Sequence, residues 1–305
     1  MTASDSIKSA ISSVSRVNLI AYVREIEGMR HGWENYDALE KRANFIENTL
    51  RSFSLQVENQ EFLFYEKKFR NIIATLKSEN DKKGIFLLGA HYDAASGSPG
   101  ADDNASGVAV LLEAARILSS MKLTRTVQFV AFTLEEPQLQ TIKFLIGSQH
   151  FAGEAKKKGI QYSAVFILES VGYINDKENS QDIPLFIKIP VPRKGTFLGV
   201  IADRRSKDIM DEFHRISGHY VPELQTVPYK VPFSGYIMPE TRFSDHASFW
   251  DKGYPALMLT DTAMFRNPNY HTWRDRSETL DYKFMENVTK AVISATVEIC
   301  FLSAH

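Results

Sequence analysis

The apolar positions of the chain follow two different periods. Residues 16–27 and 37–53 carry apolar side chains at helical spacing, which predicts two helices near the N-terminus. Residues 55–64 and 69–77 then alternate or run apolar with β-branched and aromatic residues, as strands do. Three continuous apolar runs of strand length follow, and such runs are typical of strands buried on both faces: "GIFLLGA", "VQFVAFTL" and "AVFIL".

Helical patterns separate these strands and continue towards the C-terminus. The expected helices cover residues 104–121, the later part of 142–159, 206–217, 244–253 and a stretch from about 279. Two more strands are expected over 197–203 and 254–261. Buried strands that alternate with helices predict an α/β fold, in which a mostly parallel sheet carries helices on both faces.

Nothing along the chain marks a domain boundary. It has no internal repeat, no low-complexity tract and no linker rich in Pro, Gly or Ser. We therefore predict a single domain over residues 1–305, with the N-terminal helices packed on it. The segment 174–196 is the most loop-like, and we expect it to cover one edge of a functional site.

The charge balance excludes some classes of partner. With 36 basic and 37 acidic residues the formal net charge is −1, so no global field favours nucleic acid or an anionic membrane. The N-terminus lacks the pattern of a signal peptide, and no stretch approaches the ~20 apolar residues that span a bilayer. We expect a cytoplasmic protein without nucleic-acid or membrane partners, and leave its oligomeric state open. Cys300, the single cysteine, is expected to be a small buried side chain.

Acidic and imidazole groups follow the three buried strands. They are His91 and Asp93, Glu135 and Glu136, and Glu169, with Asp102 and Asp103 in the turn before the next helix. In an open α/β sheet, ligands bind at the carboxyl ends of the strands, so these groups converge on one place. Each carboxylate taken singly could cap a helix or pair with a lysine, and Asp102 or Asn104 could be an N-cap. Taken together they would repel strongly, and a bound metal is the simplest compensation.

The C-terminal part offers further candidates. "PETRFSDHASFW" contains Asp245 and His246, and "RNPNYHTW" contains Tyr270 and His271 in an irregular loop. Neutral histidine is the commonest metal ligand and suits zinc. His246 could instead be an ordinary residue at a helix start, and His271 a surface residue of a loop. On chemistry alone, the two histidines compete for one role.

Five segments together resemble one family of enzymes. "AHYDAASGSPGADDNASGVAVLLEAAR", "AFTLEEP", "ILESVGY", "RFSDHASFW" and "RNPNYHT" occur in the order found in the M28 family of zinc aminopeptidases and carboxypeptidases. The resemblance covers roughly residues 20 to 300. It implies a three-layer αβα sandwich around a mostly parallel, mixed sheet, in agreement with the periodicity.

The resemblance also implies a set of metal ligands. The first ion would be held by His91, Asp103 and Glu169, and the second by Glu136, His271 and the same Asp103 as a bridge. The implied cofactor is a pair of Zn²⁺ ions, although Co²⁺ or Mn²⁺ would suit these ligands too.

Other residues take catalytic roles from the same resemblance. Asp93 resembles the carboxylate that orients the imidazole of His91. Glu135 resembles the general base, and Tyr270 matches a position that polarises the scissile carbonyl in some members. Asp245 and His246 are expected to contact the substrate.

Two departures from the family pattern affect the substrate more than the fold. Glu169 stands where the best-known members have Asp, and the link after Glu136 is about six residues longer than usual. The leading expectation is a di-zinc aminopeptidase acting on N-terminal residues of peptides. Glutaminyl cyclase-like acyl transfer, carboxypeptidase or dipeptidase activity, and a binding module without activity are the alternatives.

Overall fold

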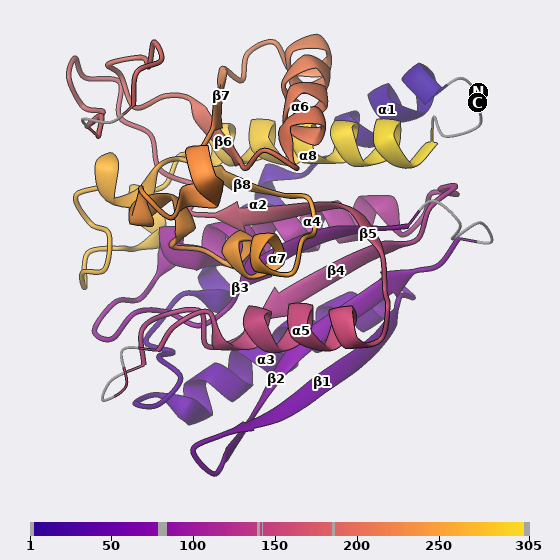
Figure 1. The fold of residues 1–305 in the computed structure, drawn as a ribbon, viewed down its shortest axis with the longest axis vertical. Helices are drawn as coiled ribbons and strands as arrows, with labels where there is room; N and C mark the ends of the chain where they lie inside the picture. The colour runs from indigo at the N-terminus through magenta and orange to yellow at the C-terminus, as the bar shows by residue number, and fades with distance from the viewer. Residues whose placement is uncertain (1–2, 79–83, 139–140, 142, 185–186, 302–305) are drawn as a thin grey trace.

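The computed structural model describes residues 3–78, 84–138, 141, 143–184 and 187–301. Within these residues one eight-stranded sheet has the order β1-β2-β4-β3-β5-β8-β6-β7 (Figure 1). The strands are β1 (Gln56–Phe64), β2 (Lys67–Leu76), β3 (Ile85–His91), β4 (Val127–Phe132), β5 (Tyr162–Glu169), β6 (Leu198–Ala202), β7 (Thr226–Lys230) and β8 (Ala256–Thr260). The central strands β4, β3, β5 and β8 are parallel, whereas β1, β2 and β6 join through antiparallel pairs, so the sheet is mixed.

Helices cover both faces of this sheet. The helices are α1 (Ala3–Ser12), α2 (Arg16–Ile26), α3 (Tyr36–Ser52), α4 (Gly107–Leu118), α5 (Ile146–Lys157), α6 (Lys207–Tyr220), α7 (His246–Asp251) and α8 (Tyr282–Phe301). In Figure 1, α5 and α7 lie in front of the sheet. None of the helices in the described part of the chain has an apolar stretch long enough to cross a membrane.

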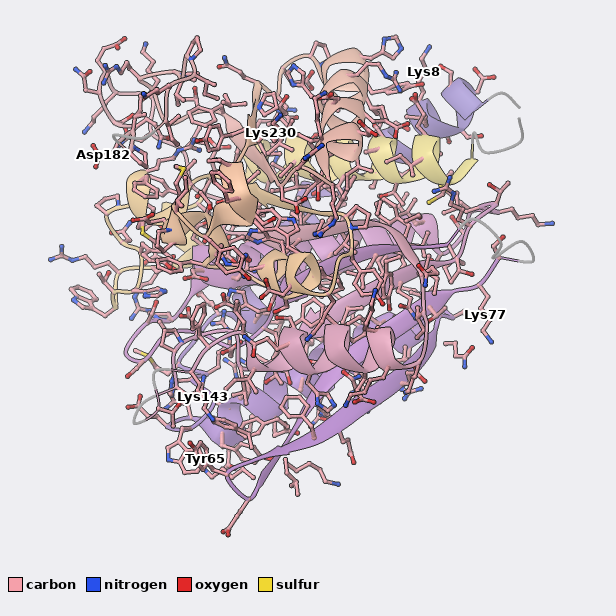
Figure 2. All side chains as sticks on the ribbon, in the orientation of Figure 1. Lys8, Tyr65, Lys77, Lys143, Asp182 and Lys230 are labelled. Atoms are coloured by element: carbon pink, nitrogen blue, oxygen red, sulfur yellow. The ribbon has the colours of Figure 1, made fainter. Side chains whose placement is uncertain are left out.

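The two faces have separate cores because side chains of a strand alternate between them. In β3, Phe86 and Leu88 belong to the larger core with α2, α3, α4, α6 and α8, and Leu87 belongs to the smaller core with α5 and α7. All of β3 except Ile85 is buried, as its unbroken apolar run predicts. Charged side chains such as Lys8 and Lys77 point outwards from the rim (Figure 2). The three-layer αβα fold is therefore confirmed.

Several boundaries differ from the expectation. α1 and β7 were not predicted by the apolar pattern, which is short and interrupted in both. The expected helix over 104–121 begins only at Gly107, because Asp103 and Asn104 have non-helical dihedral angles within a wide turn, Ala101–Ser106. β4 ends at Phe132, so Glu135 and Glu136 lie in the loop beyond the strand. The segment 174–196 contains no helix or strand among its described residues.

Candidate metal centre and active site

The carboxyl ends of three neighbouring strands form the base of the candidate site. β4, β3 and β5 are adjacent and parallel, so His91 and Glu169, the last residues of β3 and β5, lie at the same edge of the sheet. Glu135 and Glu136 reach this edge after Leu134, which has the left-handed φ of +54°. Ser170 (φ +48°) directly follows Glu169. Left-handed conformations of side-chain-bearing residues are uncommon, and they cluster at functional sites.

Asp103 lies between the two candidate histidines. Its Oδ1 atom is 3.1 Å from Nε2 of His91, and its Oδ2 atom is 3.0 Å from Nε2 of His271. His271 comes from the loop between β8 and α8 and is itself left-handed, with φ +56°. The carboxylate thus presents one oxygen to each histidine, which is the arrangement that a bridging ligand needs.

The remaining acidic groups divide between these histidines. Oε2 of Glu169 lies 3.5 Å and Oε2 of Glu135 3.8 Å from Nε2 of His91. Oε1 of Glu136 lies 3.2 Å from Nε2 of His271. The side chains form two groups whose potential ligand atoms lie within 4.8 Å of one another. One group is His91, Glu135 and Glu169, and the other is Asp103, Glu136 and His271.

These residues fit a metal on two grounds. The ligand atoms of a tetrahedral zinc site lie about 2.0–2.1 Å from the ion, and hence about 3.3 Å from each other, close to the 3.0–3.5 Å separations from the histidines to Asp103, Glu136 and Glu169. Moreover, Nε2 of His91, Oδ1 of Asp103 and Oε1 of Glu136 are buried and make no hydrogen bond with the described residues. Buried polar atoms are rarely left unpaired without a reason such as an ion.

The protonation equilibria show how strongly the charges are concentrated. Burial lowers the pKa of His271, but Asp103 and Glu136 outweigh it and raise the pKa to about 11. Burial likewise opposes the charge on His91, and Glu135 and Glu169 outweigh it, so its pKa is also raised. The pKa of Asp103 lies below its usual value because the two histidines outweigh its burial. The pKa of Glu135 is well above the ordinary value, chiefly because of burial.

Asp93 does more than the sequence predicted. Its Oδ1 atom is 3.4 Å from Nδ1 of His91, on the side of the ring away from Asp103. Its two oxygens also accept hydrogen bonds from the backbone amides of Glu135 and Glu136, at 3.0 and 3.1 Å. One buried carboxylate therefore connects the end of β3 to the loop that follows β4.

Two acidic residues to which the sequence analysis gave no role also accept hydrogen bonds from backbone amides near the site, as Asp93 does. The carboxylate of Asp275 accepts from the backbone amides of Asp102 and Asp103, at 2.9 and 3.1 Å. Asp102 is buried and accepts from the Gly172 amide and the Asn267 side chain, at 2.9 and 2.8 Å. Nothing in the local sequence distinguishes Asp275 from other loop aspartates, and Asp102 was left with no role beyond the turn. The cap-like bond comes from Asn104, which accepts from Gly107.

The other predicted residues lie around this cluster in different ways. Tyr270 stacks on His271, with ring centroids 3.9 Å apart. Asp245 is fully buried, with the Ser148 hydroxyl beside its carboxylate; burial raises its pKa to about 7. His246 packs edge-on against Trp250, and its Nε2 atom lies 2.9 Å from the Thr241 carbonyl. The structure does not place His246 in either group of ligand atoms.

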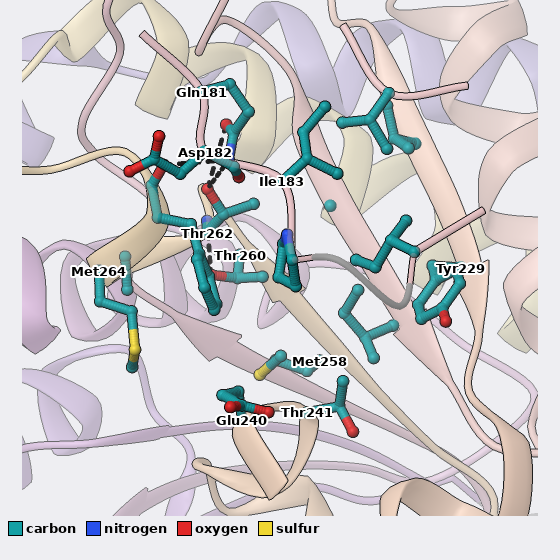
Figure 3. Close-up of a pocket in the computed structure, with 18 of the residues that line it drawn as sticks. Gln181, Asp182, Ile183, Tyr229, Glu240, Thr241, Met258, Thr260, Thr262 and Met264 are labelled. Atoms are coloured by element: carbon teal, nitrogen blue, oxygen red, sulfur yellow. Dashed lines mark hydrogen bonds between the residues drawn. The ribbon is translucent and has the colours of Figure 1, made fainter. Parts of the chain in front are cut away.

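A cavity of about 370 Å³ adjoins the site, and Glu169 and Tyr270 belong to its lining. Figure 3 shows Met258 and Tyr229 on its walls, with Gln181 and Asp182 on one side and Glu240 and Thr241 on the other. Further apolar walls come from Ile183, Ile187, Ile189, Val191, Phe197, Ile201 and Val227. Residues of the segment 174–196 thus line the cavity, as expected for a segment that covers one edge of the site.

The longer link after Glu136 contacts one residue of the cavity wall. Residues 139, 140 and 142 of this link are outside the described residues. Of the remainder, Phe144 meets Phe243, a cavity-lining residue, with ring centroids 6.2 Å apart. The link therefore contributes an aromatic contact to the wall of the cavity.

Known proteins resemble this chain in sequence. The model of peptidase family M28 matches residues 71–296. The chain is 32% identical over 270 residues to the uncharacterized protein YfbL of Escherichia coli (strain K12), covering 86% of this chain and 80% of the relative. It is 26% identical over 311 residues to a probable leucine aminopeptidase of Arthroderma otae, covering 96% and 75% of the two chains.

Solved structures agree on the fold. The LapA aminopeptidase of Legionella pneumophila superposes with a TM-score of 0.77 at 19% identity, covering 97% of this chain and 75% of that one. A glutaminyl cyclase of Porphyromonas gingivalis superposes with a TM-score of 0.69 at 21% identity, covering 94% and 99%. The family match extends from β2 into α8 and includes every candidate ligand. The chain therefore belongs to peptidase family M28 and is a metal-dependent hydrolase.

Proposed function

We propose that this protein is a di-zinc aminopeptidase that removes apolar residues from the N-termini of peptides. The observation that carries the proposal is the position of Asp103, whose two oxygens face one histidine each. A single-ion site would need only one of these contacts. The names of relatives such as the probable leucine aminopeptidase support the reaction class.

The proposed ligands are those that the family resemblance implies, and the distances between them support the assignment. His91, Asp103 and Glu169 would hold one ion, and Asp103, Glu136 and His271 the other. Glu169 is longer than Asp by one methylene, and Ser244 donates a 2.7 Å hydrogen bond to its Oε2 atom, which fixes the orientation of the longer side chain. When bound, the two ions would supply Lewis acidity that lowers the pKa of the attacking water and polarises the substrate carbonyl.

Glu135 is the proposed general base. Of the three carboxylates with an oxygen within 4.0 Å of Nε2 of His91, that of Glu135 is the farthest, at 3.8 Å, so we assign it as the base beside the ligands and not as a ligand. Burial raises its pKa, which suits a group that must take a proton from water and return it to the leaving amine. Its position depends on Asp93, which holds the backbone amides of Glu135 and Glu136 while lying next to His91.

The cavity supplies the proposed specificity. Its lining is predominantly aliphatic, aromatic and methionine side chains, which favour a large apolar side chain at the substrate N-terminus. Tyr270 lies between the metal ligands and the cavity and is proposed to contact the scissile carbonyl. The Asp245 carboxylate interacts electrostatically with His91 and is proposed to bind the substrate amine. His246 supports the cavity wall through its contact with the Thr241 carbonyl.

A panel of substrates tests the reaction. Zinc-loaded protein should release leucine from Leu-p-nitroanilide and from unblocked peptides, and leave N-acetylated peptides intact. Conversion of Gln-peptides to pyroglutamyl peptides with ammonia release would instead select the cyclase reaction, for which the P. gingivalis enzyme shows that this fold is suitable. Release of C-terminal residues from N-acetylated peptides would select a carboxypeptidase, and cleavage restricted to dipeptides a dipeptidase.

A further inference from the structure

One residue outside the proposed ligand set contacts three successive amides of the bridging turn. The backbone amides of Ala101, Asp102 and Asp103 all donate to Asp275. Ala101 bonds to the main-chain carbonyl at 3.2 Å, and the next two amides bond to the two carboxylate oxygens. Asp275 is fully buried, so these bonds are not in competition with water.

A second bond attaches the same loop to the same turn. The Asn267 side chain donates to Oδ2 of Asp102 at 2.8 Å. Asn267 and Asp275 lie on either side of His271 in the sequence. The loop that carries His271 is thus fixed at both ends to the turn that carries Asp103. Within the loop, the Asp275 amide donates to the Thr272 carbonyl at 3.1 Å, so a hydrogen-bonded turn directly follows His271 and ends at Asp275.

We propose that Asp275 is a positioning residue that sets the separation between Asp103 and His271. These two ligands come from distant parts of the chain, and their side chains lie 3.0 Å apart. Among the described residues, the Asp275 carboxylate contacts the backbone of Asp103 directly and has no atom in either ligand group. This inference rests on the proposed metal site, but it concerns how the site is built and not which peptide is cleaved.

Asp275→Asn tests this role of Asp275 most directly. An amide keeps one acceptor oxygen and turns its NH₂ group towards a backbone N–H, so one of the two carboxylate bonds is replaced by two facing donors. The side-chain volume is nearly unchanged. We expect the affinity for the ion between Asp103, Glu136 and His271 to fall about 10- to 100-fold, the usual effect of losing a residue that orients ligands.

Asp203→Asn is the matched control. Asp203 is also buried, and its Oδ1 atom accepts from the Ser206 amide at 3.0 Å and from the Ser206 hydroxyl at 2.7 Å, but it lies in neither ligand group. Metal affinity should be measured by titrating metal-free protein with Zn²⁺ against a chromophoric chelator, and with Co²⁺ by its visible absorption. The melting temperature of each metal-free variant reports whether the fold itself has changed.

The outcomes separate the inference from the proposed function. The inference is supported if Asp275→Asn lowers the affinity for one of the two ions, alters the Co²⁺ spectrum, and regains activity in excess metal, while Asp203→Asn does none of these. It is overturned if Asp275→Asn binds two ions with wild-type affinity and spectrum. A wild-type protein that binds no ion would refute the proposed function itself. If Asp275→Asn fails to fold, Asn267→Ala removes the other hydrogen bond between the loop and the turn. It should lower the affinity for the same ion to a smaller extent, and an unchanged affinity would overturn the inference.

Discussion

Asp103 directs one carboxylate oxygen at His91 and the other at His271, at 3.1 and 3.0 Å. His91 ends a central strand, whereas His271 lies in a loop near the C-terminal helix, so the carboxylate joins two parts of the chain that are distant in sequence. Three buried aspartates hold the loops around it through backbone amides: Asp93, Asp102 and Asp275. The site is therefore built as much from backbone hydrogen bonds as from ligand side chains.

Gly100 is predicted to be essential for the bridging turn. It has φ +60°, and a Cβ atom there would lie 2.3 Å from the Asp103 carbonyl oxygen and 2.9 Å from the Arg30 guanidinium. Gly100→Ala should therefore displace Asp103 and lower both metal affinity and melting temperature. Gly97→Ala is the control, because Gly97 has a similar φ of +77° but nothing within 4 Å of the added methyl group. Gly97→Ala should lower the free energy of unfolding by only about 1–2 kcal/mol, the cost of a left-handed alanine, and leave metal binding unchanged. Equal effects of the two substitutions would contradict this prediction.

Much of the site could be predicted because its ligands follow buried strands. The apolar runs before His91 and Glu169 locate two strand ends, and parallel neighbours place these ends together. The choice between His246 and His271 could not be made from chemistry alone. In the structure His246 packs on Trp250, and burial lowers its pKa to about 3, so it stays neutral. Only the arrangement of loops in space shows that His271 is the histidine next to Asp103.

The roles of Asp102 and Asp275 were beyond sequence reasoning for a different reason. Their partners are backbone amides, which every residue has, so no pattern of side chains reveals them. The strand β7, Thr226–Lys230, escaped prediction because it contains Pro228, which argues against a strand unless the strand lies at the edge of a sheet, as β7 does. The cavity, likewise, is formed by segments that meet only after folding.

Metal affinity should increase with pH. Because its pKa is raised to about 11, His271 carries a proton at neutral pH in the metal-free protein, and a cation must displace that proton. Protonated His271 stabilises the metal-free fold relative to the unfolded chain. This stabilisation is fully present below the ordinary pKa of 6.5 and is lost as the pH rises through about 11. Each displaced proton should raise the Zn²⁺ association constant about tenfold per pH unit in the neutral range. Chelator competition between about pH 6.5 and 8.5 measures this slope, and a slope of zero would refute the prediction.

Met258 is predicted to set the size of the accepted side chain. It lies on the wall of the cavity (Figure 3). Met258→Trp should fill the space and lower kcat/KM for Leu- and Phe-anilides roughly 10- to 100-fold, the effect expected from blocking part of an apolar pocket. Ala-p-nitroanilide serves as the internal control, because a methyl side chain needs little of the cavity. A uniform loss for all three substrates would show that the cavity does not bind this side chain.

The chain is predicted to unfold as one unit. α1 and α2 pack on α8, and the fully buried Arg30 donates to the carbonyls of Tyr92 and Gly100, which connects the N-terminal segment to the site. Scanning calorimetry of the metal-free protein should show one transition, with equal calorimetric and van't Hoff enthalpies. Two separate transitions would contradict the single-domain prediction.

Metal content and turnover of Glu135→Gln test the central claim most directly. Glutamine preserves the shape of the side chain but cannot accept the proton from water. The account predicts about two zinc ions per chain in both wild type and variant by elemental analysis, together with a loss of at least about 100-fold in kcat for Leu-p-nitroanilide. If the variant turns over as fast as wild type while both bind metal, Glu135 is not the base, and the proposed division between ligands and base is wrong.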